Sequence, residues 1–473
     1  MRPFQLHMMT SWCLAAMGCI LMLLPSWPGH TTGRFWNRRG LTTSRNSNIT
    51  PLRTVHVGTN PAIVAVDARD RRVFVVNEGA LVADTTGETL LPVAPGSVMM
   101  LDEATGRVLR TVPVGQNPVA VAVDMSTRRV FVLNAGRIDT SAGVTASGSS
   151  VTILDAMTGA VVRTVGVGHI PVTLSAMGAY PMARQALAID SVTRQVFVVV
   201  PTGLIVLDGA TGNIRGRVAL DSAPSLVSVD SQARRVYVGN AYDDALASDG
   251  GTTGDASSGS LAVLDLATDR ALANVALTQN HVAAMAVDRR LGRVLLVGLA
   301  GNSAACSVVE MFDARTGKRL QALSLVPGGT YRNGECAAGI DSATSRAFVL
   351  YTAGSYDLGR GTYMSVSTLD TRGNRLVGAV ELLQSNETRG TFLNRSVVVD
   401  ERDNRVLAAA AQGENGSVKG SLVRVLDART GRVLYPLRVS TGPQDAAVDE
   451  NARRLFITNG HANTLDVFDA SRL

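Results

Sequence analysis

Short apolar runs alternate with turn residues from residue 52 to the end of the chain. A run of Val and Ala ends at Asp67, a short charged segment follows, and the next run begins at Arg72. Runs of this length, rich in valine and bounded by Asp, Arg and Gly, are typical of β-strands joined by tight turns. Nothing in the sequence resembles a long amphipathic helix. The pattern predicts an all-β protein.

The phrase around Asp67 is repeated along the chain. In every copy a large apolar residue lies seven positions after an aspartate, and an arginine lies five positions after it except at Gln195. The aspartate and arginine are expected to cap their own hairpin and to face solvent. The aspartates of this phrase, called the first aspartates, are Asp67, Asp124, Asp190, Asp230, Asp288, Asp341, Asp400 and Asp449.

A second phrase alternates with the first. Its aspartate is usually followed by Thr-Gly, as Asp102 is by Thr105 and Gly106, and a further apolar run comes next. Each repeat therefore has four β segments, named A to D in chain order. A four-stranded antiparallel unit that recurs every 40–66 residues is the signature of a propeller blade. The second aspartates are Asp102, Asp155, Asp208, Asp265, Asp313, Asp370, Asp427 and Asp469.

The repeat count predicts an eight-bladed β-propeller of four-stranded antiparallel blades, with a seven-bladed ring as the alternative. The A segments consist mainly of small residues, which suit strands crowded around a propeller axis. Residues 52–58 form a D segment with no partners before it, and the last repeat stops after its C segment at Asp469. The N-terminal strand is therefore expected to complete the last blade and close the ring.

The repeat resembles that of the YVTN-repeat β-propellers, of the surface-layer and periplasmic type, in the quinoprotein amine dehydrogenase beta-chain-like superfamily. The matching segments are Gly58-Thr-Asn-Pro61, Arg72-Val-Phe-Val-Val-Asn77, Val98-Met-Met-Leu-Asp102 and Val112-Pro-Val-Gly115. The resemblance covers residues 52–473 and implies an extracellular or periplasmic propeller. It implies no particular reaction, although related propellers include lactonases, a lyase and the cofactor-free subunit of redox enzymes. Repeats three to seven mostly lack Gly-x-x-Pro and the Asn that ends segment B.

The N-terminus has the features of an export signal. Arg2 precedes an apolar stretch from Trp12 to Leu24, which is shorter than the ~20 residues that span a bilayer. Because no clear cleavage site follows, residues 1–27 are interpreted as a signal peptide or a membrane anchor. Residues 28–51 are interpreted as a flexible linker and residues 52–473 as the propeller. The expected location is extracytoplasmic: secreted, periplasmic or at the cell surface, with or without a membrane tether.

The net charge of +6 comes mostly from the N-terminus, because residues 1–51 hold five arginines and no acid. Residues 52–473 contain 40 basic and 39 acidic side chains. A nucleic-acid-binding domain normally concentrates positive charge on its folded surface. The balance therefore argues against nucleic acid as a partner.

The two faces of the predicted disc differ in loop length. The A–B and C–D turns share one face, called the turn face, and are nearly constant in length. The B–C and D–A loops share the other, called the loop face. There the distance from first to second aspartate varies from 18 residues after Asp190 to 35 after Asp67. Such insertions often carry binding residues, although drift in tolerated loops would give the same pattern.

Candidate site residues are sought on the loop face. Cys306 and Cys336 lie in loops of neighbouring repeats, and an even pair in an exported chain predicts a disulfide. No cofactor is predicted, although carboxylates of one glycine-rich loop could hold calcium. Those carboxylates are Asp243, Asp244, Asp249 and Asp255. The binding or catalytic candidates are His169, Tyr180, His281, Tyr331, Glu335, Arg389 and His461.

These features leave three functions open. The favoured hypothesis is a non-catalytic scaffold that holds a protein, glycan or cell-envelope component on the loop face, because no catalytic motif is found. The second is a lactonase- or lyase-like enzyme with its site at the channel mouth, which requires several candidate side chains to converge. The third is the non-cofactor subunit of a periplasmic redox enzyme. The sequence thus favours a binding protein and leaves catalysis undecided.

Overall fold

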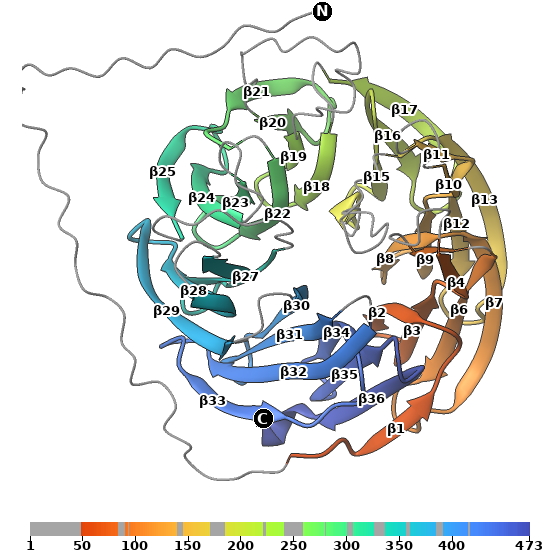
Figure 1. Ribbon diagram of the computed structural model, residues 1–473. Coiled ribbons are helices and arrows are strands. Elements are labelled where there is room, and N and C mark those ends of the chain that lie inside the picture. Colours follow the sequence, from red (N-terminus) through yellow and green to blue (C-terminus); the bar gives the residue numbers. More distant parts are fainter. Residues whose placement is uncertain are drawn as a thin grey trace, which may run out of the picture. The chain divides into compact units, whose positions relative to one another are not determined.

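The structure is a computed structural model. It describes residues 49–83, 90–92, 94–139, 145–170, 185–220, 224–240, 259–279, 281–299, 306–325, 336–355, 360–384, 391–414 and 417–473. These residues form eight antiparallel four-stranded sheets arranged in a ring (Figure 1). The protein is therefore an eight-bladed β-propeller, as the repeat count predicted. The described segments are nearly all strand, apart from turns and a short 3-10 helix, η3 (Ala470–Arg472).

The first four blades follow the chain in order, each running from strand A at the axis to strand D at the rim. Blade one contains β2 (Pro61–Asp67), β3 (Arg72–Asn77), β6 (Pro95–Asp102) and β7 (Val108–Gln116). Blade two contains β8 (Pro118–Asp124), β9 (Arg129–Asn134), β12 (Ser149–Asp155) and β13 (Val161–Gly168). Blade three contains β14 (Leu187–Asp190), β15 (Gln195–Val200), β16 (Gly203–Asp208) and β17 (Ile214–Ala219). Blade four contains β18 (Pro224–Asp230), β19 (Arg235–Asn240), β20 (Ser260–Asp265) and β21 (Ala271–Ala276).

The last four blades complete the ring. Blade five contains β22 (His281–Asp288), β23 (Arg293–Leu299), β24 (Cys306–Asp313) and β25 (Arg319–Ser324). Blade six contains β26 (Ala337–Asp341), β27 (Arg346–Ser355), β28 (Arg360–Asp370) and β29 (Arg375–Gln384). Blade seven contains β30 (Thr391–Asp400), β31 (Arg405–Glu414), β32 (Ser417–Asp427) and β33 (Val433–Leu437). Blade eight contains β34 (Pro443–Asp449), β35 (Arg454–Asn459), β36 (Thr464–Asp469) and β1 (Arg53–His56).

The hydrophobic core fills the spaces between neighbouring blades. The large residue seven positions after each first aspartate is at most 1% exposed in all eight blades. Burying a side chain of this size contributes about 2–3 kcal/mol. Tyr237 also donates its hydroxyl hydrogen to the carbonyl of Ala314 in the next blade, at 2.9 Å. The inner strands contact one another in a closed order, from β2 through β8, β14, β18, β22, β26, β30 and β34 back to β2.

The first aspartates close the A–B turns from inside the structure. All eight are at most 2% exposed, so they do not face solvent as the sequence suggested. In blade four, Oδ1 of Asp230 accepts the amides of Gln232 at 2.9 Å and Ala233 at 3.0 Å. These bonds hold the residue four positions after each aspartate at a φ of 52° to 62°. In five blades that residue is an arginine, although side chains disfavour this backbone conformation.

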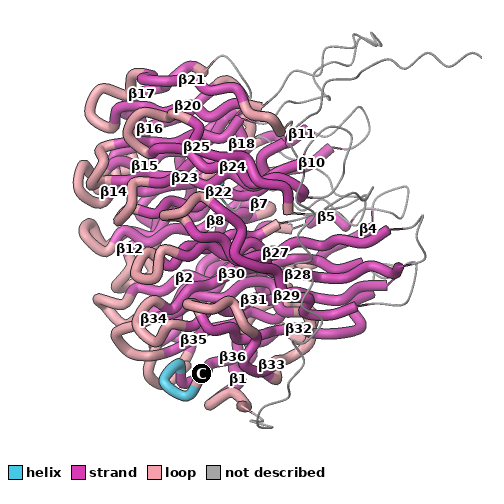
Figure 2. Tube along the Cα trace, turned by 90° about the vertical axis from the view of Figure 1, so that its left-hand side faces the viewer, coloured by secondary structure: helices cyan, strands magenta, loops and turns pink. Residues whose placement is uncertain are grey.

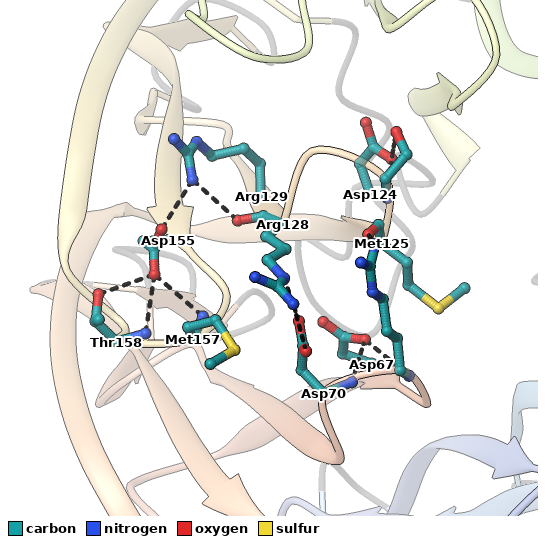
Figure 3. A network of polar contacts seen from close by, with 11 residues as sticks. Asp67, Asp70, Asp124, Met125, Arg128, Arg129, Asp155, Met157 and Thr158 are labelled. Carbon is teal, nitrogen blue, oxygen red and sulfur yellow. Dashed lines mark hydrogen bonds and ion pairs between the residues drawn. The ribbon is translucent and has the colours of Figure 1, made fainter.

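The arginine that follows each A–B turn pairs with a different acid from the one expected. Nη1 of Arg129 lies 2.8 Å from Oδ2 of Asp155, a second aspartate, and not against the first aspartate Asp124 (Figure 3). The same pairing joins strands B and C in blades one, four, five, six and eight at 3.2–3.8 Å. The strand register explains it, because Arg129 and Asp155 are direct partners in the β9–β12 ladder.

Neighbouring turns are also tied to each other across the blade boundaries. Arg69 donates to the carbonyl of Met125 at 2.9 Å. Arg128 pairs with Asp70 at 3.1 Å (Figure 3). Both contacts join blade one to blade two. Arg453 and Asp403 make the corresponding contact between blades eight and seven at 2.6 Å. The turn face is thus a polar network rather than a set of separate hairpins.

The ring closes as predicted, through the N-terminal strand. β1 pairs with β36 in antiparallel register, with Arg53 opposite Val467 and His56 opposite Thr464. The fully buried carboxylate of Asp466 lies at this seam. It accepts hydrogen bonds from Oγ1 of Thr54 at 2.7 Å, from the amide and hydroxyl of Ser440 at 2.7 and 3.0 Å, and from Nδ2 of Asn459 at 3.1 Å. One carboxylate therefore holds the closing strand, strand β35 and the segment before β34.

A second buried acid lies at the same seam. In blade six, Thr371 directly follows a second aspartate. Its hydroxyl donates to Asp288 of the previous blade at 2.8 Å. Blade one has Glu103 at the position of Thr371, with a fully buried side chain. Burial raises the pKa of Glu103; the hydrogen bond from Arg71 acts in the opposite direction, and Asp449 of blade eight adds to the increase.

Replacing Asp466 with alanine should lower the free energy of unfolding by about 3 kcal/mol, because four hydrogen bonds to a fully buried carboxylate are lost. Urea unfolding of the full chain measures the change. The matched control is Thr54→Val, which removes one of these bonds and should cost about 1 kcal/mol. Equal losses for the two variants would show that Asp466 does not organise the seam.

Glu103→Gln should become more stabilising, relative to the unaltered chain, as the pH rises. Since the folded-state pKa of Glu103 is raised, its contribution to stability is present at low pH and is lost as the pH passes the folded-state pKa. Glutamine cannot ionise, so the variant should gain stability relative to the unaltered chain between acidic and neutral pH. Unfolding midpoints across this pH range provide the test. A difference that does not change with pH would contradict the prediction.

Candidate functional site

The loop face carries two kinds of addition to the basic blade. In blades one and two, the B–C loops contain the hairpins β4 (Leu81–Ala83) with β5 (Leu90–Pro92), and β10 (Arg137–Asp139) with β11 (Thr145–Ser147). In blades six and seven, the B and C strands themselves are longer, with 10 or 11 residues each. Figure 2 shows these strands extending on the side opposite the short turns.

The long strands of blades six and seven remain paired as they leave the body of the disc. Pairing continues to Ser355 with Arg360 in blade six and to Glu414 with Ser417 in blade seven. Sequence reasoning treated these residues as loop insertions. The uninterrupted run of apolar and small residues from Val406 to Ala411 was the available signal for the longer strand in blade seven. Part of the loop face is therefore a regular sheet extension, which presents a more rigid surface than a loop.

The predicted disulfide is present between Cys306 and Cys336, whose Cα atoms are 6.2 Å apart. Cys306 begins β24 in blade five and is fully buried. Cys336 precedes β26 in blade six and packs against the same apolar cluster. The bond thus fixes two loop-face segments of adjacent blades to each other, as the sequence indicated.

A polar contact that sequence reasoning missed joins two blades that are not neighbours. Gln185, just before the inner strand of blade three, donates Nε2–H to the carbonyl of Met285 and accepts its amide, both at 2.8 Å. Met285 lies in β22, the inner strand of blade five. An inner strand has an unpaired edge toward the channel, and the amide of Gln185 satisfies two groups on that edge. No spacing rule links residues 185 and 285.

The three histidine candidates lie in different blades. His169 is exposed after β13 in blade two, His281 begins β22 in blade five, and His461 is exposed between β35 and β36 in blade eight. Among the residues that the structure describes, no group of three or more His, Cys, Asp or Glu side chains could hold a metal ion.

Other candidates lie outside the described residues and remain predictions. They are Tyr180, Tyr331, Glu335, Arg389, Asp243, Asp244, Asp249 and Asp255. The expected export segment at 1–27 and nearly all of the expected linker at 28–51 also lie outside. In the described part of the chain, no helix is long and apolar enough to cross a bilayer.

The exposed charged side chains of the turn face all have the same sign. Each turn is taken here as a second or first aspartate and the five residues after it, where the chain has them. Within these turns every acidic side chain is buried or half-buried, and every charged residue that is exposed is a cation. The exposed cations are Arg69, Arg71, Arg107, Arg128, Arg194, Arg234, Arg270, Arg289, Arg290, Arg315, Lys318, Arg372, Arg375, Arg402, Arg429, Arg432 and Arg472.

The second aspartates are held in their charged form by the turns that they close. Burial acts to raise the pKa of Asp208, but the amide and hydroxyl of Thr211 and the side chain of Arg215 outweigh it and lower the pKa to about 2. Nε of Arg215 donates to Oδ2 of Asp208 at 3.0 Å. Arg215 thus replaces the arginine that other blades have at the position of Gln195. The pKa is lowered at the other seven second aspartates as well. Their negative charge is therefore directed into the turns.

Comparisons with known proteins support the fold. No protein-family model and no curated protein matches the sequence. The Dos1 propeller has a TM-score of 0.60 at 11% identity, with 89% of this chain and 96% of that chain covered. Hydrazine synthase from Kuenenia stuttgartiensis has a TM-score of 0.51 at 13% identity, with 75% of this chain and 97% of that chain covered. These similarities show the β-propeller fold alone, and membership of the YVTN-repeat family stays a prediction.

Replacing both Cys306 and Cys336 with serine should lower the free energy of unfolding by about 3–4 kcal/mol, the amount expected for a closed loop of this length. Thermal unfolding of the full chain without reductant measures the loss. Reductant added to the unaltered chain should reproduce most of it and should leave the variant unchanged. A variant as stable as the oxidised chain would contradict the prediction.

Proposed function

We propose that the protein is an extracytoplasmic scaffold that binds a protein or glycan component of the cell envelope on its loop face. The observation that carries this proposal is the construction of that face. Its additions are paired strands, and the Cys306–Cys336 disulfide links two other segments of this face in blades five and six. The opposite face repeats one short turn around the ring.

Rigid additions favour binding over neutral drift as the explanation of the loop lengths. Insertions that are merely tolerated need no regular structure. Paired strands and a cross-link lower the conformational entropy that is lost on binding, so a surface built this way is suited to a partner. The extensions of blades six and seven are the largest example in the described part of the chain.

Two features support a location outside the cytoplasm. The disulfide is consistent with an oxidising compartment. The apolar stretch from Trp12 to Leu24 supports export through a signal peptide or an anchor. A YVTN-type surface or periplasmic propeller has the same expected location.

The enzyme alternative has less support. A site at the channel mouth requires titratable side chains from several blades to meet. His169, His281 and His461 belong to blades two, five and eight. Among the polar side chains that bond to inner strands of other blades, Gln185 is an amide already bonded to Met285 and without acid–base function. Asp445 in β34 accepts the amide of Val64 in β2 at 3.2 Å, and it is one carboxylate rather than a converging group.

A photo-crosslinking amino acid placed on the loop face should capture the partner in intact cells. Suitable positions are Val82 in β4, which is 51% exposed, and Arg137 in β10, which is also exposed. Val192 on the turn face, which is 78% exposed, is the matched control. We expect one discrete adduct of protein or glycan from Val82 or Arg137 and no protein or glycan adduct from Val192. No adduct at either loop-face position, or the same adduct at Val192, would refute the proposal.

A further inference from the structure

The exposed charged side chains of the turn face are all cations. Cations such as Arg107, Arg234, Arg315, Lys318 and Arg429 are exposed there, and no exposed acid lies among them. All eight blades contribute at least one. Residues 52–473 contain nearly equal numbers of acids and bases. Within the turns the acids are the more buried group, because many of them accept turn amides or pair with an arginine, and the more exposed groups are therefore cations.

Exposed apolar side chains lie on the same face. Met125, Met157 and Val192 are 43%, 41% and 78% exposed, and all three belong to turns of blades two and three. Figure 3 shows Met125 and Met157 beside the Asp–Arg network of these turns. Exposed apolar groups surrounded by arginine are typical of surfaces that bind at the headgroup level of a membrane.

The N-terminal segment joins the propeller on this same side. D strands start from the turn face, and β1, which completes blade eight, begins there at Arg53 opposite Val467. Ile49 packs into the cluster that contains Ala470 and Leu473, at the turn-face end of blade eight. The residues before Ile49 include the apolar stretch from Trp12 to Leu24 and several arginines without any acid.

We propose that the turn face docks on an anionic lipid surface, with its arginines against lipid phosphates and its three exposed apolar side chains at the interface. Guanidinium groups bind phosphate oxygens in a bidentate manner, and basic residues close to an anionic leaflet add to the attraction. Docking in this orientation leaves the loop face directed away from the bilayer. The proposal extends the binding scaffold by giving it an orientation and does not depend on the identity of its partner.

Co-flotation of the full chain with vesicles tests the docking. Binding should rise with the fraction of anionic phosphatidylglycerol and should fall in high salt, which screens exposed charges. Neutral phosphatidylcholine vesicles serve as the control. Binding to them measures the contribution of the apolar N-terminal stretch to vesicle binding, because every variant retains that stretch.

Charge reversal separates the turn face from general cationic attraction. The triple variant Arg315→Glu, Lys318→Glu, Arg429→Glu should lose about tenfold or more of the binding that depends on anionic lipid. The matched control Arg137→Glu, Arg217→Glu, Arg438→Glu changes the net charge equally at exposed sites outside the turn face. It should stay within about twofold of the unaltered chain, because its charges lie away from the bilayer. Equal losses in the two variants would overturn the proposal.

Hydrogen–deuterium exchange shows which face meets the vesicle even if the N-terminal stretch keeps every variant bound. Anionic vesicles, compared with neutral ones, should slow amide exchange in the turns around Lys318 and Arg429 and leave β4 and β10 unchanged. Slowing on the loop face, or on neither face, would overturn the proposal. Binding to soluble polyphosphate with the same sensitivity to charge reversal, without binding to vesicles, would assign the face to a free polyanion instead. Failure here leaves the crosslinking test of the loop face unaffected.

Discussion

An aspartate that accepts the amides of its own turn is the contact on which the rest of the propeller depends. It recurs at the ends of the A strands and C strands, and it holds the residue four positions later in a left-handed conformation even where that residue is Arg234. A turn fixed in this way sets the direction in which the next strand leaves. The large residue of each B strand, such as Phe131, then reaches the space between two blades and is fully buried. Losing one such aspartate would therefore disturb the core between blades and not only a surface turn.

The same contact accounts for the difference between the two faces. A turn with one or two amides bonded to its own carboxylate cannot gain a residue without losing those bonds, so insertions accumulate at the other end of the strands. The carboxylates are drawn inward, and the arginines that follow them, such as Arg129, pair with Asp155 or remain exposed, as Arg128 largely does. A domain with nearly balanced charge thus exposes mainly cations on one face. Counting charges along the chain could not show this, because the count does not include burial.

Much of the fold could be predicted because it is periodic. The spacing of the two aspartates predicts four strands in each repeat, and the repeat count predicts eight blades. The unmatched segments at the two ends of the repeat region predict the closing strand. The disulfide followed from placing Cys306 and Cys336 in this frame. Contacts outside the period were missed. Arg129 selects Asp155 over Asp124 through the register of β9 and β12, and Gln185 reaches Met285 across a blade that separates them. Periodicity assigned the candidate histidines to blades, but it could not say whether their side chains meet.

The way in which the turn face attaches to a membrane depends on whether the N-terminal segment is retained. Each exposed arginine contributes about 1 kcal/mol at an anionic surface, and salt weakens that attraction, so the turn face alone would bind reversibly. If residues 28–51 are the flexible linker that the sequence predicts, their root-mean-square span is about 25–30 Å. A retained anchor would then raise the effective concentration of the disc at the bilayer surface. The turn face would then mainly set orientation, and the loop face would remain available to a partner. If the segment is cleaved, the same arginines must supply all of the attachment, and binding becomes sensitive to salt. Whether residues 1–27 are retained therefore decides between a fixed, oriented scaffold and a peripheral one that can leave the surface.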